Sequence, residues 1–260
     1  IGHLQTPIVM QQFWNRNEQK IQQRKVQISH HNKFVRKIFY RGSWLLGGRI
    51  HGGFWQQIKE ERFNILINDF RTVELDYSGL HINIAYALEG LPPRIEDPYS
   101  LDLMFDFNQQ QQRNLIKILS LILINAKDQP SAISAFRNAQ PTGTEAKRLS
   151  DRNIIRMIDS FKEKHKPIAK YLCSDQGVKF MNIDGAICSK VINHFTDMNE
   201  PILSVHDSYI CREHFKDELI EVMNEIISNT LQGYVVGIKA NKELQDYSQF
   251  KEQGVINLGR

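Results

Sequence analysis

Hydrophobic and polar residues alternate most clearly in the first third of the chain. Residues 71–76 (RTVELD) alternate and contain β-branched side chains, which is typical of a half-buried strand. Tyr77-Ser78-Gly79 interrupts this pattern, and residues 80–88 are helical in character until a Pro-Pro pair ends the run. The pattern predicts a strand, a tight break and a helix, with Asp76 at the end of the strand.

Longer helices are predicted where Gly and Pro are missing. Residues 109–125 contain neither, and the polar side chains of Arg113, Lys117 and Asn125 recur at multiples of four residues, which places them on one helical face. Further helices are expected at 151–172 with a disturbance at Pro167, at 184–195 and at about 213–231.

Two short apolar runs near the C-terminal end predict a β-hairpin. The runs 201–205 (PILSV) and 209–211 flank His206-Asp207-Ser208, so an acidic residue is expected at the tip of the hairpin. Another short strand is expected at 234–238.

The N-terminal part of the chain is basic. Residues 11–40 lack Gly and Pro and predict one or two helices, followed by a Gly-rich passage at 46–55 that is typical of loops and hairpins. Between Arg16 and Arg41 there are eight Lys or Arg residues and one acid, with aromatic residues interleaved. This mixture suits a surface that binds nucleic acid, and a solvated helical face explains it equally well.

Composition limits the class of protein. A chain of 260 residues with 41% hydrophobic and 24% charged residues is expected to fold as one compact unit. It contains no apolar run long enough to span a bilayer, and its start at Ile1 shows no secretory signal. Three widely spaced cysteines argue against a disulfide framework or a zinc site and favour a reducing, cytoplasmic setting; they are Cys173, Cys188 and Cys211.

Two acids occupy positions that suit metal binding. Asp76 and Asp207 each lie where a strand meets a break, and strand ends hold a side chain rigidly. Carboxylates from two strands can bind two Mg²⁺ ions about 3.5–4 Å apart, the arrangement used for phosphoryl and nucleotidyl transfer. Either residue taken alone is more commonly a turn or cap residue.

The helix at 109–125 carries a candidate anion site. Arg113 and Lys117 lie one turn apart, and no acid in the same helix neutralises them. Arg can bind phosphate oxygens with two hydrogen bonds, and Lys can donate a proton to departing pyrophosphate. A solvated helical face is the alternative.

Taken in order, these segments resemble the family A DNA polymerases and the related phage-type single-subunit RNA polymerases. Residues 75–87 (LDYSGLHINIAYA) are similar to motif A, Arg113-xxx-Lys117 to motif B, and residues 204–209 (SVHDSY) to motif C. Gly48-Arg49 and the Asp-Gly of residues 183–191 (IDGAICSKV) also fall where these families keep such pairs. The resemblance covers roughly residues 47–210.

The resemblance implies a role for each matched residue. Asp76 and Asp207 would bind two Mg²⁺ ions, and Lys117 would assist catalysis. The nucleoside triphosphate would meet Arg113, Lys117, Asn125, His81 and Tyr77. The nucleic acid would meet Arg49, and His206 would support the primer end.

The implied fold is α+β, a right-hand polymerase palm with an antiparallel sheet packed on helices, helical fingers and a reduced or absent thumb. Residues 1–45 would form a basic helical segment, either a thumb remnant or a nucleic-acid-binding element. Residues 46–260 would form the palm, with the fingers inserted at about 90–175. Two departures concern the sugar and base: Asn125-Ala126 replaces Tyr-Gly, and His81 stands where DNA polymerases place Glu.

The resulting hypothesis is a template-directed nucleotidyltransferase that leans to DNA synthesis because of Asp-Tyr-Ser. A single-subunit RNA polymerase or primase-like enzyme is the alternative, because His-Asp-Ser is the RNA polymerase form. A two-metal nuclease and a catalytically inactive palm-like binding module are further alternatives. Expected partners are template, primer and nucleoside triphosphates, with no membrane; a phage, plasmid or other mobile element is one candidate source.

Several other residues are expected to have structural roles and no part in the chemistry. Phe54, Trp55 and Trp44 lie beside glycines and are expected to plug the core more often than to stack on bases. Asp159 and Asp184 are expected at helix caps or on the surface. The histidines, including His30-His31 and His194, lack partners at zinc-ligand spacing.

Overall fold

A computed structural model describes residues 8–15, 20–27, 33–93, 96–101, 107–241 and 256–257. The chain divides into two compact units, each built from more than one stretch of the sequence. Unit 1 contains residues 1–13, 23–80 and 181–260, and unit 2 contains residues 14–22 and 81–180. Both helices and strands are present, so the protein is of the α+β class.

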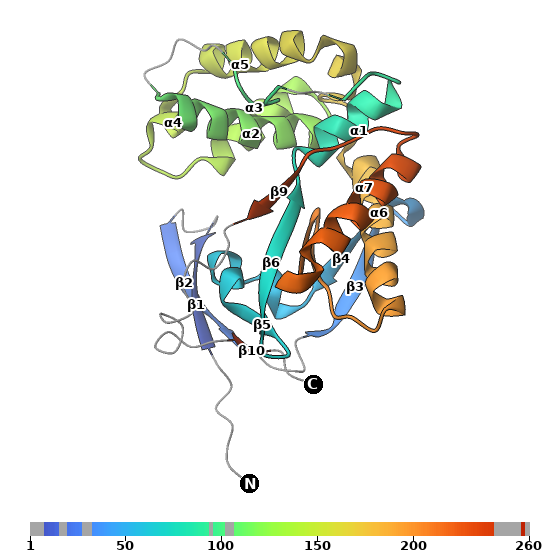
Figure 1. Ribbon diagram of the computed structural model, residues 1–260. Coiled ribbons are helices and arrows are strands. Elements are labelled where there is room, and N and C mark those ends of the chain that lie inside the picture. The colour runs from blue at the N-terminus through green and yellow to red at the C-terminus, as the bar shows by residue number, and fades with distance from the viewer. Residues whose placement is uncertain are drawn as a thin grey trace. The chain divides into compact units, whose positions relative to one another are not determined.

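A mostly antiparallel sheet forms the centre of unit 1 (Figure 1). Its path is β10-β5-β6-β8-β7, and β9 joins the same edge of β6 beyond the short hairpin made by β5. The strands are β5 (Ile65–Ile67), β6 (Phe70–Tyr77), β7 (Leu203–Val205), β8 (Ser208–Arg212), β9 (Ile238–Asn241) and β10 (Ile256–Asn257). β10 pairs with β5 in parallel, and the other pairs are antiparallel.

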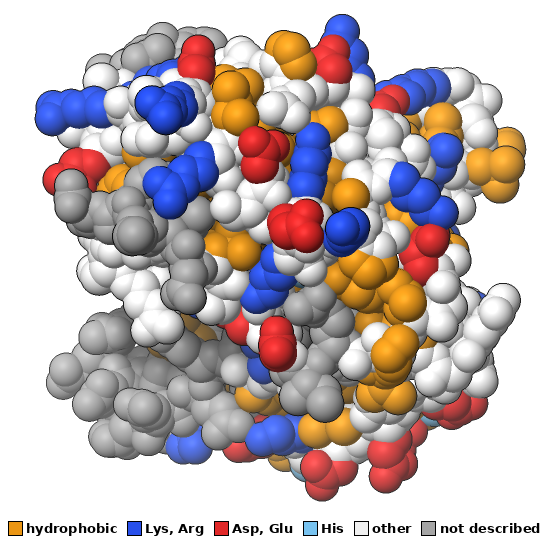
Figure 2. All heavy atoms as spheres, turned by 90° about the horizontal axis from the view of Figure 1, so that it is seen from above, with side chains coloured by type: hydrophobic (Ala, Val, Ile, Leu, Met, Phe, Trp, Pro, Cys, Tyr) orange, Lys and Arg blue, Asp and Glu red, His pale blue; other side chains and the backbone are white. Residues whose placement is uncertain are grey.

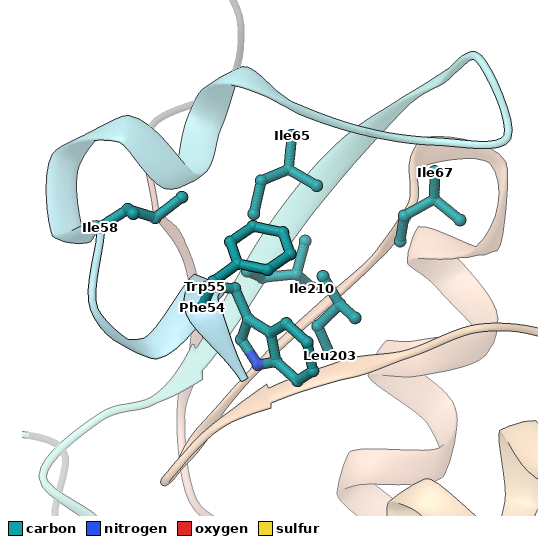
Figure 3. Close-up of a cluster of buried hydrophobic side chains, with 7 residues drawn as sticks. All are labelled: Phe54, Trp55, Ile58, Ile65, Ile67, Leu203 and Ile210. Carbon is teal, nitrogen blue, oxygen red and sulfur yellow. The ribbon is translucent and has the colours of Figure 1, made fainter. Parts of the chain in front are cut away.

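The sheet is fixed by an apolar cluster beside the β7–β8 hairpin (Figure 3). Phe54 and Trp55, in the short 3₁₀ helix η2 (Phe54–Gln56), are buried among aliphatic side chains of β5, β7 and β8. The indole Nε1 of Trp55 donates to the Ser204 carbonyl oxygen at 2.9 Å, so the polar atom of this buried ring is satisfied. The expectation that Phe54 and Trp55 plug the core is confirmed, whereas Trp44 is exposed.

The N-terminal part consists of strands. β1 (Ile8–Asn15) pairs with β2 (Lys20–Gln27), and β3 (Val35–Tyr40) forms an antiparallel hairpin with β4 (Ser43–Gly52). The expectation of helices at 11–40 is therefore wrong. The run 35–40 (VRKIFY) is β-branched and aromatic, and this preference decides its local structure. His30 and His31 lie outside the described residues.

Two long helices cover the sheet of unit 1. α6 (Gly177–Asp197) and α7 (Lys216–Thr230) are both present in the expected regions, although α6 begins earlier than expected. α7 follows η5 (Glu213–Phe215) and packs against β6, where the Tyr77 hydroxyl donates to the Met223 carbonyl oxygen at 2.6 Å. The last expected strand is displaced: β9 starts at Ile238, the final residue of the predicted run.

Unit 2 is helical. α1 (Leu80–Leu88), α2 (Gln109–Asn125) and α5 (Asp151–Lys164) match the expected helices, and the 3₁₀ helix η4 (Lys166–Tyr171) follows α5 where Pro167 was expected to disturb it. Asn108 caps α2 in a reciprocal pair with Gln111. α3 (Gln129–Ala139) and the short α4 (Glu145–Arg148) were not predicted, because their polar sequences resemble a loop.

The cysteines and the surface are described by three observations. Cys173, Cys188 and Cys211 are all free. Within the described ranges, none of the helices has the length and apolar character that crossing a membrane requires. On the face drawn in Figure 2, Lys and Arg side chains lie among acidic and hydrophobic ones, so the charge of the described residues there is mixed.

Candidate active site

Asp76 and Asp207 come together because β6 and β8 are neighbours in the sheet. Asp76 is in register with Ser208, the residue that follows Asp207. The Tyr77 amide also donates to the Asp207 carbonyl oxygen at 3.2 Å, which ties the end of β6 to the turn between β7 and β8. Two acids that are 131 residues apart in the sequence are therefore held at one end of the same strand pair.

The two carboxylates repel each other electrostatically. Burial, together with the negative charges of Asp76 and Asp184, raises the pKa of Asp207 to about 7 against the opposing effect of Arg49. A carboxyl group with this pKa is half protonated near neutral pH unless a cation neutralises the site. The site therefore favours the binding of a cation.

A lysine partly neutralises Asp76. β9 pairs with β6 so that Lys239 is in register with Asp76, and Lys239 Nζ lies 3.0 Å from Asp76 Oδ2. The lysine side chain is half exposed, so this ion pair can exchange with solvent cations. Lys239 was not among the residues that the sequence suggested, because only the strand register places it there.

A second acid on β6, Glu74, already has protein partners at both of its oxygens. The guanidinium of Arg62 donates to both Glu74 oxygens, at 3.0 and 3.1 Å. The Ser208 hydroxyl donates to Glu74 Oε1 at 2.7 Å. The serine of His-Asp-Ser, Ser208, thus links β8 to β6. Glu74 differs from the acids at the strand end because Arg62 and Ser208 occupy both of its oxygens.

Arg49 and Asp184 form a buried ion pair beside these acids. Arg49 Nε donates to Asp184 Oδ2, and the Asp184 side chain is only 1% exposed. The expectation that Asp184 lies at a cap or on the surface is wrong, because a charge at this depth is retained only when it is paired. Asp159, by contrast, is exposed as expected.

Two glycines allow this ion pair to form. A Cβ atom at Gly185 in α6 would lie 2.3 Å from the Gly48 carbonyl oxygen in β4. The Gly-Arg of β4 and the Asp-Gly of α6, which the sequence singles out separately, therefore pack against each other with their backbones in direct contact. This contact places the Arg49 guanidinium on Asp184.

Gly185→Ala is expected to lower the free energy of unfolding by about 2 kcal/mol, because the added methyl group overlaps a backbone oxygen that cannot rotate away. A Gly→Ala change within a helix ordinarily stabilises by about 1 kcal/mol, so the sign is diagnostic. Urea unfolding measures it, with Gly237→Ala as the control because its nearest neighbour is 3.9 Å away. A stabilised Gly185→Ala protein would contradict the close packing.

His206 adopts a left-handed backbone conformation, with φ of 59°, in the turn before Asp207. Its ring meets the ring of His51 edge to face, with centroids 5.4 Å apart. Burial, together with the charge of Arg49 and the neighbouring His51, lowers the pKa of His206 to about 4. His206 is therefore neutral at physiological pH and offers hydrogen-bonding nitrogens rather than a positive charge. Its contact with a primer end stays a prediction.

The anion-binding pair of α2 is modified by an acid from outside the helix. Arg113 donates to both oxygens of Asp97, at 2.6 and 3.1 Å. Burial raises the pKa of Asp97, but hydrogen bonds from Arg113 and from the Tyr99 amide outweigh it and the pKa is lowered. Arg113 is therefore neutralised by Asp97, although α2 itself contains no acid. Lys117 is exposed on the same helix.

The other three residues expected to contact the nucleotide are His81, Asn125 and Tyr77, and each is held by neighbouring protein groups. His81 is buried at the start of α1, with its ring 5.9 Å from that of Phe180. Asn125 Nδ2 donates to the Leu121 carbonyl oxygen, and a Cβ atom at Gly177 would overlap the Asn125 amide. Tyr77 is buried with its hydroxyl bonded to α7, so a nucleotide contact would require its ring to leave the core.

The residues at the strand end suit a magnesium ion in number and type. Mg²⁺ is usually held by one or two carboxylates together with water and substrate phosphates, and Asp76 and Asp207 supply two. Burial and the charge of Asp76 raise the pKa of Asp207, and a bound cation would offset both effects. In the described ranges, no cluster of three or more His, Cys, Asp or Glu side chains is placed for a metal.

No family model and no curated protein sequence matches the chain. Among solved structures, it is similar to the POL domain of Pol1 from M. smegmatis in complex with DNA primer-template and dNTP, with 12% sequence identity and a TM-score of 0.43. The likeness covers 65% of this chain and 39% of that one. The likeness is distant, so the functional argument depends on the site residues.

Proposed function

We propose that this protein is a template-directed nucleotidyltransferase that adds nucleotides to a 3′ end at Asp76 and Asp207. The single observation that supports it best is the register of β6 with β8, which puts these two acids at one end of adjacent strands. A palm with helical fingers is part of the proposal, with unit 1 as the palm and unit 2 as the fingers.

The metal would be held by Asp76 and Asp207. Two Mg²⁺ ions, when bound, would activate the attacking oxygen and stabilise the charge on the leaving phosphate. The chain's own residues surround this site with charges: Lys239 forms an ion pair with Asp76, and Arg49, which is paired with Asp184, lowers the pKa of Asp207. Arg49 is therefore proposed to act on the acids, in addition to the nucleic-acid contact that its sequence position implies.

The triphosphate is assigned to Arg113 and Lys117. Lys117 is the exposed cation of the pair, so it meets an anion without first giving up a partner among the described residues. Arg113 would exchange Asp97 for phosphate oxygens, which present the same bidentate geometry. We also assign His81 and Asn125 to the nucleotide. Neither side chain indicates whether the sugar is ribose or deoxyribose.

Lys117→Ala is expected to slow nucleotide addition about a hundredfold, because a proton donor for the leaving pyrophosphate is lost. The dissociation constant for template–primer is expected to change less than about twofold. Single-turnover extension and fluorescence anisotropy measure the two quantities, and Lys166→Ala removes an equally exposed lysine as the control. An unchanged rate, or equal losses in rate and binding, would exclude this role.

A catalytically inactive binding module is the second candidate, because Lys239 and Asp97 already occupy Asp76 and Arg113. Extension of a labelled primer separates the two. The assay uses DNA and RNA templates with Mg²⁺, and supplies dNTPs and NTPs in separate reactions. Extension with dNTPs supports DNA synthesis, extension with NTPs supports the RNA polymerase or primase-like alternative, and binding without extension supports the inactive module.

A further inference from the structure

The tip of the β3–β4 hairpin exposes large apolar side chains. Trp44 is 79% exposed and Leu45 is 75% exposed, next to the turn at Arg41-Gly42. Trp is highly buried on average in folded proteins, so an indole this exposed needs an explanation. The proposed polymerase site does not use either side chain.

The hairpin tip is held in place by its backbone. Arg41 and Gly42 both have positive φ values, 54° and 64°, as a tight hairpin turn requires. The side-chain amide of Asn182 in α6 donates to the carbonyl oxygens of Trp44, at 2.9 Å, and Gly47, at 3.2 Å. The backbone that carries Trp44 is thus held by α6 on the β4 side of the turn.

The indole of Trp44 contacts one neighbouring ring and stays largely open to solvent. The Phe39 and Trp44 rings meet edge to face, with centroids 4.7 Å apart. This contact orients the indole without covering it, as the exposed fraction of 79% shows. An oriented and open aromatic face is the element on which a nucleic-acid base stacks.

The hairpin that carries this tip is positively charged. Residues 33–58 include five Lys or Arg residues and no Asp or Glu. Three of the five are exposed: Arg41 lies in the turn, and Arg36 and Lys37 lie farther along β3. A base-stacking ring among cations matches the two parts of a nucleotide, the base and the phosphate.

We propose that the tip of this hairpin binds single-stranded nucleic acid, with a base stacked on Trp44 and the backbone phosphates beside Arg41 and Arg36. The inference rests on the proposed function in that the bound strand would be a template or primer. Binding at the hairpin itself requires neither the carboxylates nor the metal, so the two proposals fail independently.

A contact between two copies of the chain is the competing use of an exposed tryptophan. A symmetric contact through this tip would bring Arg41 of one copy close to Arg41 of the other. Like charges placed together at an interface are unfavourable, and two apolar side chains bury too little surface to offset this. A polyanionic strand meets the same surface with opposite charge.

Fluorescence anisotropy with labelled dT and rU dodecamers and a blunt duplex, in EDTA, tests the proposal on the full chain. Trp44→Ala is expected to weaken binding of the single strands about tenfold, and Trp44→Tyr to restore it to within about threefold, because any aromatic face can stack. Phe70→Ala, which removes a 51% exposed aromatic ring elsewhere in unit 1, is expected to bind as the unaltered protein does. Arg41→Gln is expected to reduce the salt dependence of binding.

Equal affinities of Trp44→Ala and the unaltered protein would overturn the proposal, as would equal losses in Trp44→Ala and Phe70→Ala. Loss of a dimer in Trp44→Ala by sedimentation, with strand binding unchanged, would assign the tip to self-association instead. Asp207→Asn, measured in parallel, is expected to bind normally. Hairpin-dependent binding by a protein that extends no primer would contradict the proposed function and leave this inference standing.

Discussion

Asp207→Asn is expected to reduce nucleotide addition about a thousandfold or more while the protein stays folded. The substitution keeps the size of the side chain but removes a charge on which the proposed metal site depends. Metal stabilisation of a transition state contributes several kcal/mol, and each 1.36 kcal/mol corresponds to tenfold in rate. Asp76→Asn is expected to act in the same way, because the two acids form one site.

The same variant is expected to be more stable than the unaltered protein at pH 8 in the presence of EDTA. The pKa of Asp207 is about 7 in the folded protein against an ordinary value of 3.8, so protonation favours the folded state. This contribution is complete below pH 3.8 and is lost as the pH rises through 7. After allowance for solvent relaxation, we expect a gain of about 1–2 kcal/mol at pH 8.

Thermal unfolding between pH 4 and pH 8 measures this difference, which is expected to shrink towards the acid end. Mg²⁺ is expected to raise the melting temperature of the unaltered protein and not of Asp207→Asn, because a ligand stabilises only a state that binds it. Asp197→Asn, at an exposed site in the same unit, is the control. If the stability gain of Asp207→Asn over the unaltered protein were smaller at pH 8 than at pH 4, the assigned pKa would be contradicted.

Asp184→Ala is expected to lower the free energy of unfolding by about 3–4 kcal/mol, the largest stability loss that we expect of any single change. Removal of one member of a buried ion pair leaves the other charge without compensation. Urea unfolding measures the loss, and the same protein is expected to bind Mg²⁺ more weakly if its altered surroundings disturb Asp207.

A double-mutant cycle separates the ion pair from simple loss of packing. The double variant Arg49→Met, Asp184→Ala is expected to lose less unfolding free energy than the sum of the two single losses. In the double variant neither charge of the pair is left without its partner. Additive losses would show that Arg49 and Asp184 contribute separately, and would contradict the coupling.

The sequence predicted the elements whose patterns are strong. The alternating run at β6, the Gly- and Pro-free helix α2 and the hairpin around Asp207 all have clear local signals. α3 was missed because its short apolar face, with Ala132 and Phe136 one turn apart, stands among polar residues, and its cap at Asp128 was not recognised. The strands at 8–40 were missed because a lack of Gly and Pro was interpreted as helical, although Val35–Tyr40 favours a strand.

The sequence pointed to the two acids of the candidate site, Asp76 and Asp207. It did not point to the charged residues that surround them. Asp76 and Asp207 were found because each interrupts a recognisable local pattern. Lys239 and Asp184 depend on strand register and on the packing of α6 against β4, which connect residues far apart in the sequence. Only the glycines offered a signal, since Gly48 and Gly185 each stand beside the charge that they bring into contact.

Single-turnover extension of a primer by one nucleotide tests whether the two carboxylates carry catalysis, with the unaltered protein, Asp207→Asn and Asp197→Asn compared at one template–primer concentration. We expect template-directed, Mg²⁺-dependent addition by the unaltered protein and by Asp197→Asn, and a loss of about a thousandfold in Asp207→Asn. Addition by Asp207→Asn at the unaltered rate would contradict the assignment of catalysis to the two carboxylates.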